Sequence, residues 1–242
     1  MKEGPVLFKG EMVRAILEGR KTQTRRAVKV QPPPECIEIS NCGGGEFDML
    51  HYVAMGRTQR GHIGFIKCPY GKPGDRLWVK ESHFLLGRWE MNGKTKTGKD
   101  KWRFFPFQAG GVLFPENKPK TVRPNTYRRN GWYKRNSLFM PRWASRITLE
   151  ITGIRVERLD RISDDDALAE GILEENCIVG CHCAGGYHQE VMGVRYFHEN
   201  GNEEGYESAD DAYKDLWESI NGPGSWDANP WVWVIEFKRV TP

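Results

Sequence analysis

The order of the secondary-structure patterns in this chain excludes most α/β folds. Short strand patterns follow one another with few helices between them, from the first at 6–8 to the last at 231–240. Apolar residues spaced one helical turn apart predict helices at 11–18 and 208–220. Ser163 with Asp166, and Ser208 with Asp211, resemble capping boxes, which predicts a short helix at 163–169 and the start of the helix at 208. With so few strand–helix–strand units, a mostly antiparallel sheet is expected instead of a doubly wound parallel one. We therefore predict an α+β fold, a small antiparallel β-barrel with helices on its rim.

Three long stretches of the chain show little periodicity. They span residues 35–70, 87–140 and 173–206. Stretches of this length without regular structure are uncommon inside compact domains and are usually functional or disordered. The length of 242 residues suits one domain with large insertions. We therefore expect a single domain over 1–242, with long irregular insertions at these three places.

The charges of the chain are segregated along the sequence. Residues 94–146 hold 14 Lys and Arg against two acidic residues, whereas residues 150–218 hold 18 Asp and Glu against five basic ones. Opposite charges of this kind can stabilise a fold by facing each other, or can create a positive surface that attracts phosphate. If residues 94–146 form such a positive surface, the expected partner is RNA or single-stranded DNA.

Aromatic side chains alternate with cations in the second insertion, most densely in the stretch TYRRNGWYKR at 126–135. Single-stranded nucleic acids are bound by cations that neutralise phosphates and by rings that stack on bases. The candidate contacts in this stretch are Arg128, Arg129, Trp132, Tyr133, Lys134 and Arg135. The alternative is that the rings form a small separate core and the cations only solvate it.

The segment GRKTQTRR at 19–26 ends a helix and places cations and threonines directly after it. Gly19 suits a helix C-cap, because glycine accepts the left-handed conformation. Strand alternation would separate Lys21 from Thr24, but a turn at Lys21 would bring Lys21, Thr24 and Arg26 to one face. The segment would then line a cleft at the mouth of the barrel. Its alternative is a solvated strand edge, since runs of surface charge are common.

This segment, read as helix-Gly-Arg-Lys-Thr-x-Thr-x-Arg, resembles the signature of ASCH domains, a branch of the PUA-like β-barrels that bind RNA and modified nucleobases. Three further segments resemble the family in type and order: GDRL at 74–77, the acidic helix at 159–172 and the closing strand VWVIEF at 232–237. The whole chain is similar to the longer ASCH-containing proteins of bacteriophages and prophages. The resemblance implies a PUA-like barrel at the centre of the chain.

The resemblance also implies an activity. Small ASCH proteins are amidohydrolases that act on N4-acetylcytidine with a lysine, a threonine and a glutamate, and matching the motifs assigns these roles to Lys21, Thr24 and Glu170. Arg20 and Arg26 are then candidates for binding the substrate, and catalysis requires no cofactor. Two other functions remain open, a non-catalytic reader of RNA or DNA and an ASCH-type ribonuclease.

The chemistry of this set depends on the pKa of Lys21. A threonine hydroxyl needs an adjacent base, and a lysine amine serves as one only if its pKa falls towards neutrality. Burial and neighbouring arginines lower this pKa, whereas Glu170 raises it, and the sequence leaves the balance open. Two alternatives exist for Glu170. It is either an exposed residue near a helix C-terminus, or its role belongs to Asp166 one turn earlier.

Cysteines and histidines cluster in the third insertion. Structural zinc is held by four N or S ligands in a tetrahedron. The candidates are Cys177, Cys181, Cys183 and His188. A second, looser set consists of Cys36, Cys42, His62 and Cys68. The alternative to a structural zinc site is free thiols.

The hydropathy of the chain predicts neither a membrane span nor export. No run of about 18 apolar residues occurs, the length that a membrane-spanning helix needs. The first residues lack the long apolar region of a signal peptide. The protein is therefore expected to be cytoplasmic, and to act in the host cytoplasm if a phage encodes it.

Overall fold

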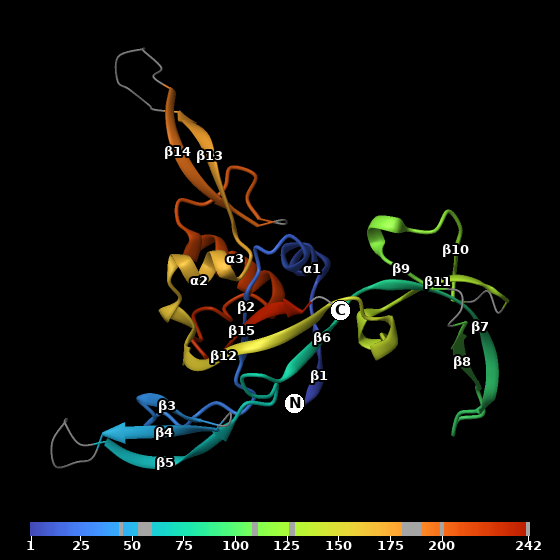
Figure 1. Cartoon of the computed structure of the whole chain (residues 1–242), viewed down its shortest axis with the longest axis horizontal. Helices are drawn as coiled ribbons and strands as arrows, with labels where there is room; N and C mark the ends of the chain where they lie inside the picture. The colour runs from blue at the N-terminus through green and yellow to red at the C-terminus, as the bar shows by residue number, and fades with distance from the viewer. Residues whose placement is uncertain are drawn as a thin grey trace. The chain divides into compact units, whose positions relative to one another are not determined.

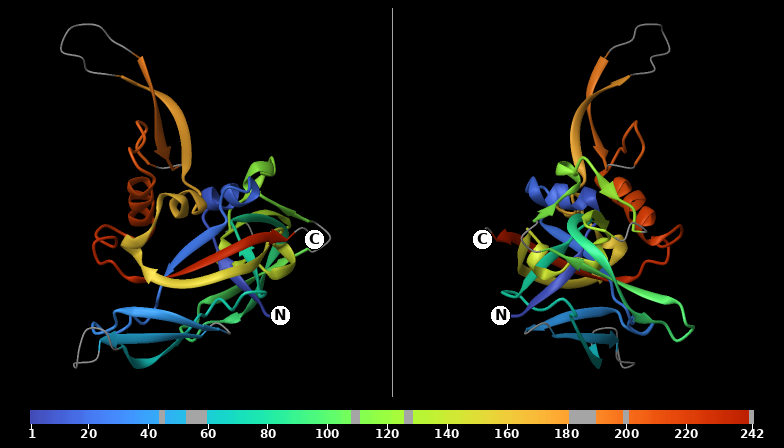
Figure 2. Two further views of the ribbon diagram at one scale, coloured as in Figure 1. Left: turned by 60° about the vertical axis from the view of Figure 1, so that its left-hand side comes forward. Right: turned by 90° about the vertical axis from the view of Figure 1, so that its right-hand side faces the viewer.

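The structure is a computed structural model that describes residues 1–43, 46–52, 60–107, 111–125, 129–180, 190–198 and 201–240 (Figures 1 and 2). The chain divides into two compact units. Unit 1 comprises Met1–Gly4, Arg14–Leu77 and Leu149–Pro242, and unit 2 comprises Pro5–Val13 and Trp78–Thr148.

The described residues form an α+β fold made mostly of strands, as the sequence predicted. The strands are β1 (Glu3–Leu7), β2 (Gln23–Ala27), β3 (Glu38–Gly43), β4 (Glu46–Tyr52), β5 (Arg60–Lys67), β6 (Arg76–Lys80), β7 (His83–Lys94), β8 (Asp100–Pro106), β9 (Val112–Leu113), β10 (Val122–Arg123), β11 (Gly131–Arg135), β12 (Thr148–Arg158), β13 (Leu173–Gly180), β14 (Glu190–Phe197) and β15 (Trp231–Val240). The α-helices are α1 (Gly10–Leu17), α2 (Asp164–Ala169) and α3 (Ala209–Asn221). Short 3-10 turns are η2 (Pro115–Asn117), η3 (Ser137–Phe139), η4 (Arg142–Ala144) and η5 (Leu159–Arg161).

A five-stranded sheet in the order β1-β6-β12-β15-β2 holds the strands that the sequence predicted best. β15 lies inside this sheet and is buried at six of its first seven positions, because its apolar residues occupy both faces. β2 pairs antiparallel with β15 and forms one end of the strand order. The neighbour of the Lys21 segment is therefore the most deeply buried strand of the sheet.

The three helices begin and end within one residue of the bounds that the sequence predicted. Ser163 caps α2 by accepting a hydrogen bond from the Asp166 N–H, and Ser208 caps α3 in the same way through Asp211. Each cap satisfies a backbone N–H that the first helical turn leaves without a partner. α3 packs its apolar side inward, with Tyr213 among its buried residues. None of the described helices is long and apolar enough to cross a bilayer.

The prediction of irregular insertions was wrong for much of their length. The first contains the antiparallel sheet β3-β4-β5, the second contains a sheet in the order β10-β11-β7-β8 with β9 against β7, and the third contains the hairpin β13-β14. Ribbons of two or three strands are held by backbone hydrogen bonds and cannot bury a continuous apolar face. The sequences of β3-β4-β5 and β13-β14 therefore lack the alternation by which strands were recognised elsewhere. The sheet of the second insertion is larger and buries Phe84, Leu85 and Tyr133.

The hairpin β13-β14 is tied to α3 by side chains that follow β14. His198 Nε2 lies 2.8 Å from Asp215 Oδ2 on α3, and the Tyr206 hydroxyl donates to the same oxygen over 2.8 Å. The His198 and Tyr206 rings are stacked, with centroids 5.7 Å apart. These contacts hold the open end of the hairpin, where β13 begins and β14 ends, against α3, the helix that carries Tyr213.

Candidate functional site

The backbone that carries Lys21 is fixed between α1 and the end of α2. Gly19 ends α1 with φ +80°, after which the Lys21 N–H donates to the Ala15 carbonyl over 3.0 Å. The Thr22 N–H donates to the carbonyl of Ala169, the last residue of α2, over 2.9 Å. Lys21 thus lies next to the residue that follows α2, which is Glu170.

Glu170 directs its carboxylate at the Lys21 amine. Lys21 Nζ donates to Glu170 Oε2 over 2.6 Å and to the Glu170 carbonyl over 2.7 Å. The two side chains are 2% and 4% exposed, so water cannot replace these bonds. This position excludes the alternative of an exposed Glu170. Asp166, the other candidate, instead accepts hydrogen bonds from Arg25 and Arg155.

Arg25 completes the buried cluster, although the sequence indicated it only as a neighbouring charge. Its guanidinium is fully buried and lies 2.6 Å from Glu157 Oε1, 2.8 Å from Asp166 Oδ2 and 3.5 Å from Glu170 Oε1. The Glu170 carboxylate is therefore shared, with Oε1 towards Arg25 and Oε2 towards Lys21. The sequence held no local signal for this cluster, because the carboxylates that a buried arginine needs come from β12, from α2 and from the residue after α2, far along the chain.

Burial decides the direction in which the pKa of Lys21 shifts, which the sequence left open. Burial lowers the pKa of Lys21 below its usual 10.5. Glu170 opposes this shift, while the charges of Arg26 and Arg25 add to it, and the net direction is down. Burial also raises the pKa of Tyr213 well above its usual 10. The Tyr213 ring lies below Arg25, whose Cζ is 5.9 Å from the ring centroid. The site thus combines an amine that deprotonates more readily than usual with a phenol that stays protonated.

Thr24 is buried on β2, but it faces the other way from Arg25. Thr24 pairs with Ile235 and Arg25 with Val234 of β15, and successive side chains of a strand point to opposite faces. Thr24 is only 4% exposed, so both faces of β2 are covered. The register therefore joins Lys21, Glu170 and Arg25 on one face and places the Thr24 hydroxyl on the other.

The two remaining arginines of the segment lie at its borders. Arg26 is half-buried on the Thr24 face and acts on Lys21 through its charge. Arg20 donates from Nη1 to the Gly171 carbonyl over 3.0 Å and pairs with Glu18. Arg20 is therefore engaged in holding the turn after α2.

Gly171 directly follows Glu170, and its left-handed backbone conformation helps to position that side chain. Replacing Gly171 should therefore lower the stability of the protein. Its φ is +104°, and an added Cβ would lie 3.2 Å from the Ala15 Cβ and 3.5 Å from the Lys21 Cβ. We expect Gly171→Ala to lower the free energy of unfolding by about 1–3 kcal/mol, the range for a strained left-handed residue. Urea unfolding measures this change. Gly98→Ala is the control for backbone strain alone, since its φ is +80° with open space around the Cβ; an equal loss in both would mean that packing against Lys21 contributes nothing.

Within the described part of the basic aromatic stretch, Tyr133 and Arg135 pack against other aromatic rings. Tyr133 on β11 is fully buried, and its ring centroid lies 5.4 Å from that of Phe104. The Arg135 guanidinium stacks 4.6 Å from the Phe104 centroid and 5.2 Å from that of Trp89. The rings thus form the separate small core that was the alternative to base stacking. Tyr133 has no face left for a base.

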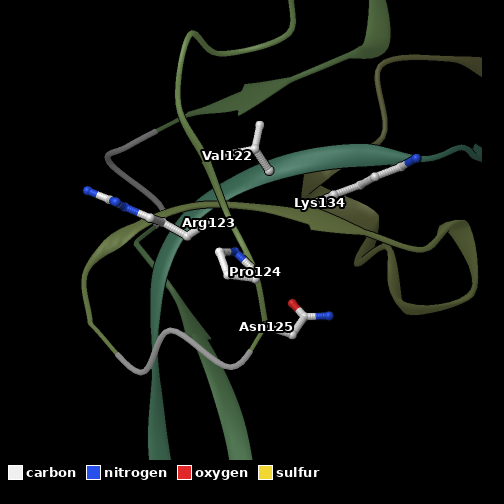
Figure 3. Close-up of a pocket in the computed structure, with 5 residues that line it drawn as sticks. All are labelled: Val122, Arg123, Pro124, Asn125 and Lys134. Carbon is white, nitrogen blue, oxygen red and sulfur yellow. The ribbon is translucent and has the colours of Figure 1, made fainter.

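The exposed cations of this stretch remain candidates for contact with phosphates. Arg129 and Lys134 are exposed, whereas Trp132 is half-buried. Arg128 lies outside the described residues. A hollow of about 370 Å³ beside β10 is lined by Arg123 and Lys134, among others. Figure 3 shows these two side chains extending away from each other, so they do not converge on one anion.

The zinc prediction is left open by the structure. Cys177 is half-buried on β13. Cys181, Cys183 and His188 lie outside the described residues. Within the parts of the chain that are described, no group of three or more His, Cys, Asp or Glu side chains is arranged to hold a metal ion. Of the second set, Cys36 and Cys68 are buried and Cys42 is exposed.

The geometry of Lys21, Glu170 and Arg25 is thus the main ground for inferring a function. The resemblance to ASCH domains is a second ground, and it rests on sequence motifs alone. Comparison of the chain with protein-family models, with curated proteins and with solved structures finds no match.

Proposed function

We propose that this protein hydrolyses the acyl-amide bond of an acylated nucleoside such as N4-acetylcytidine. The observation that supports this most is the buried hydrogen bond from Lys21 Nζ to Glu170 Oε2, 2.6 Å long, at a lysine whose pKa is lowered by burial. A general base works best when its pKa lies near the working pH. We further propose that the five-stranded sheet belongs to a PUA-like barrel of the ASCH type.

In this proposal Lys21 moves the proton and Glu170 holds the amine. Neutral Lys21 Nζ removes a proton from an attacking hydroxyl, which adds to the acyl carbonyl carbon. The C–N bond then breaks, and the proton passes from Lys21 to the leaving nitrogen. With water as the nucleophile, the acyl group leaves directly as a carboxylate. With Thr24 as the nucleophile, which requires its hydroxyl to reach the face of Lys21, water afterwards releases the acyl group from the threonine ester as a carboxylate. Arg25 keeps Glu170 in place through Oε1, which leaves Oε2 for Lys21.

The test is incubation of the purified protein with N4-acetylcytidine, N4-methylcytidine and a short RNA, followed by mass spectrometry. We expect the acetylated nucleoside to lose its acetyl group as acetate and the methylated one to remain intact. An amide is cleaved by this chemistry, whereas an N-methyl group offers no carbonyl to attack. Absence of acetate release from all acylated nucleosides and from acetylated RNA would overturn the proposal.

Two substitutions at Thr24 separate its roles in the same assay. Thr24→Val keeps the shape of this buried side chain and removes the hydroxyl, whereas Thr24→Ser keeps a hydroxyl. If Thr24 is the nucleophile, we expect no turnover in Thr24→Val and measurable turnover in Thr24→Ser. Equal turnover in both would assign the attack to water, which is compatible with the position of Thr24 on the face opposite Arg25.

A non-catalytic RNA reader is the second candidate, supported by the exposed cations Arg129 and Lys134. It is distinguished in the same experiment. RNA retained by the intact protein at low salt and released at high salt, with no product, would favour the reader, because binding through phosphates weakens steeply with salt. Shortened RNA would favour the ribonuclease.

A further inference from the structure

A cavity of about 400 Å³ in unit 1 lies beside the loop that joins β5 to β6. It is lined by the charged side chains of Lys2, Lys67, Lys72 and Asp75, and by Met1, Cys68 and Gly71. Cavities that bind small molecules range from about 300 to 1,000 Å³. The three lysines come from two parts of the chain, the residues before β1 and those that end or follow β5, and the fold brings them to one cavity.

The loop that forms this cavity is held by its own backbone. Cys68 accepts hydrogen bonds from the backbone of Tyr70 and Gly71. The Gly74 N–H donates to the Ile151 carbonyl, and the Ile151 N–H donates to the Asp75 carbonyl, each over 2.9 Å. The bonds to Cys68 hold the start of the loop together, and those to the buried Ile151 join its end to β12. The cavity wall therefore needs no ligand to take its shape.

The Asp75 carboxylate accepts hydrogen bonds from backbone N–H groups with both of its oxygens, so it is not directly paired with the lysine ammonium groups. Its Oδ1 accepts from the Lys2 N–H over 2.6 Å, and its Oδ2 accepts from the Lys72 N–H over 3.2 Å. The Lys2 N–H bond is the main cause that keeps the pKa of Asp75 below its usual value. Gly71 permits this arrangement, because its φ is +128° and a Cβ there would lie 2.9 Å from Asp75 Oδ2.

The Lys2 side chain is fixed at its base by the same contacts. Besides donating to Asp75, Lys2 accepts a hydrogen bond at its carbonyl from the Arg76 N–H over 2.8 Å. Lys67 pairs with Glu46 over 3.3 Å, and both side chains are exposed at 71% and 54%, so solvent screens this pair and an anion can displace it. Lys2 and Lys72 thus provide the cationic centre of the cavity, and Lys67 adds to it.

We propose that this cavity binds the diphosphate group of a small phosphorylated ligand. Lys2, Lys67 and Lys72 line this concave site together with one carboxylate, Asp75. Even with Glu46 counted as the partner of Lys67, positive charges outnumber negative ones there. Lysine binds phosphate as a point charge, without the planar fork by which arginine fits a particular geometry. The lining contains no aromatic ring for a nucleobase to stack on. Affinity should therefore follow the charge of the anion and depend little on the base attached to it.

The test is calorimetric titration of the full chain with pyrophosphate, phosphate, sulfate and cytidine diphosphate at low salt and neutral pH. We expect pyrophosphate to bind more tightly than phosphate or sulfate, and cytidine diphosphate to bind within a few-fold of pyrophosphate. Much tighter binding of the nucleotide would assign a base-recognising ligand and overturn a site that reads charge alone. No detectable binding of any of these anions would overturn the site altogether.

Matched variants locate the binding. Lys2→Ala and Lys72→Ala should each weaken pyrophosphate by about tenfold, the order expected for losing one nearby cation at a partly exposed site. Both leave intact the backbone N–H groups that hold Asp75, so the loop should stay folded. Lys29→Ala is the control, since Lys29 is exposed in the same unit and does not line the cavity. An equal loss in Lys29→Ala, or none in the two cavity variants, would contradict the proposal.

This site does not depend on the activity proposed for Lys21. Lys21→Met should bind pyrophosphate as the unchanged protein does, even if it has lost all turnover. Failure of hydrolysis and failure of anion binding are therefore separate results. Loss of pyrophosphate binding in folded Lys21→Met would place the anion at the Lys21 cluster instead, and would contradict the assignment to the cavity.

Discussion

Replacing Lys21 by methionine is expected to lower kcat/KM for N4-acetylcytidine by about a thousandfold, within the range of about 10² to 10⁴ that a general base contributes. Methionine has nearly the length of lysine and is accepted in apolar surroundings, but it cannot take a proton. The side chain of Lys21 is 2% exposed, so buffer molecules have poor access to replace it. Steady-state kinetics of the two proteins measure the change.

Lys21→Arg is the matched control for charge. Arginine keeps a cation opposite Glu170 but does not deprotonate in proteins. If Lys21 acts as a base, Lys21→Arg should be as inactive as Lys21→Met while thermal unfolding shows a folded protein. Retained turnover in Lys21→Arg would mean that the position acts through its positive charge, and the proposed proton transfer would be wrong.

The pH dependence of the rate gives a second measure of the same group. Because burial lowers the pKa of Lys21, the rate should rise with pH and reach its plateau below the usual lysine value of 10.5. Glu170 raises this pKa by its charge and its hydrogen bond. Glu170→Gln should therefore move the rise to lower pH, and a shift to higher pH would contradict the assignment.

The sequence predicted those elements whose signals are local. The Ser163 and Ser208 caps lie where their spacing to Asp166 and Asp211 indicated, because a cap is a hydrogen bond between residues three positions apart. The closing strand has the predicted bounds of Trp231–Val240, since burial on both faces leaves a continuous apolar run. Signals of this kind need no knowledge of the rest of the fold.

The features that the sequence missed depend on distant residues. The ribbons β3-β4-β5 and β13-β14 are defined by backbone pairing between strands, which leaves little trace in side-chain periodicity. The site was predicted in part, because a motif can indicate Lys21 and Glu170 without showing how they meet. The role of Arg25 could not be predicted, since its three carboxylate partners lie 132 to 145 positions away.

Arg25 is expected to be the residue whose loss destabilises unit 1 most. We expect Arg25→Met to lower the free energy of unfolding at neutral pH by about 3–5 kcal/mol, the range for breaking a buried ion pair from one side. Its guanidinium is fully buried, whereas Glu157 and Asp166 are 18% and 22% exposed. Arg155 also pairs with both of these carboxylates, which favours the lower end of the range. Chemical denaturation measures the loss.

The loss of unfolding free energy in Arg25→Met should become smaller in acid. The direction of this pH dependence follows from the pKa shift of Asp166. Burial raises the pKa of Asp166, but hydrogen bonds from Arg155 and Arg25 outweigh it, so the net shift is downward from 3.8. The stability contributed by this shift is present above 3.8 and is lost as pH falls through the lower folded value. Repulsion among the carboxylates that Arg25→Met leaves behind also disappears once they are protonated. The difference between the two proteins should therefore be largest at neutral pH and should decrease as the pH falls through the lowered pKa of Asp166.

A surface ion pair in the same unit is the control for Arg25. Lys238→Met removes the pair of Lys238 with Glu150, in which the lysine side chain is 62% exposed, and should cost at most about 1 kcal/mol. A neutral-pH loss for Arg25→Met no larger than this would show that the three carboxylates rearrange without Arg25. Glu170 would then lack the fixed position that the Lys21 mechanism needs. The stability of Arg25→Met thus tests the same geometry as the kinetics of Lys21→Met, with a measurement that requires no substrate.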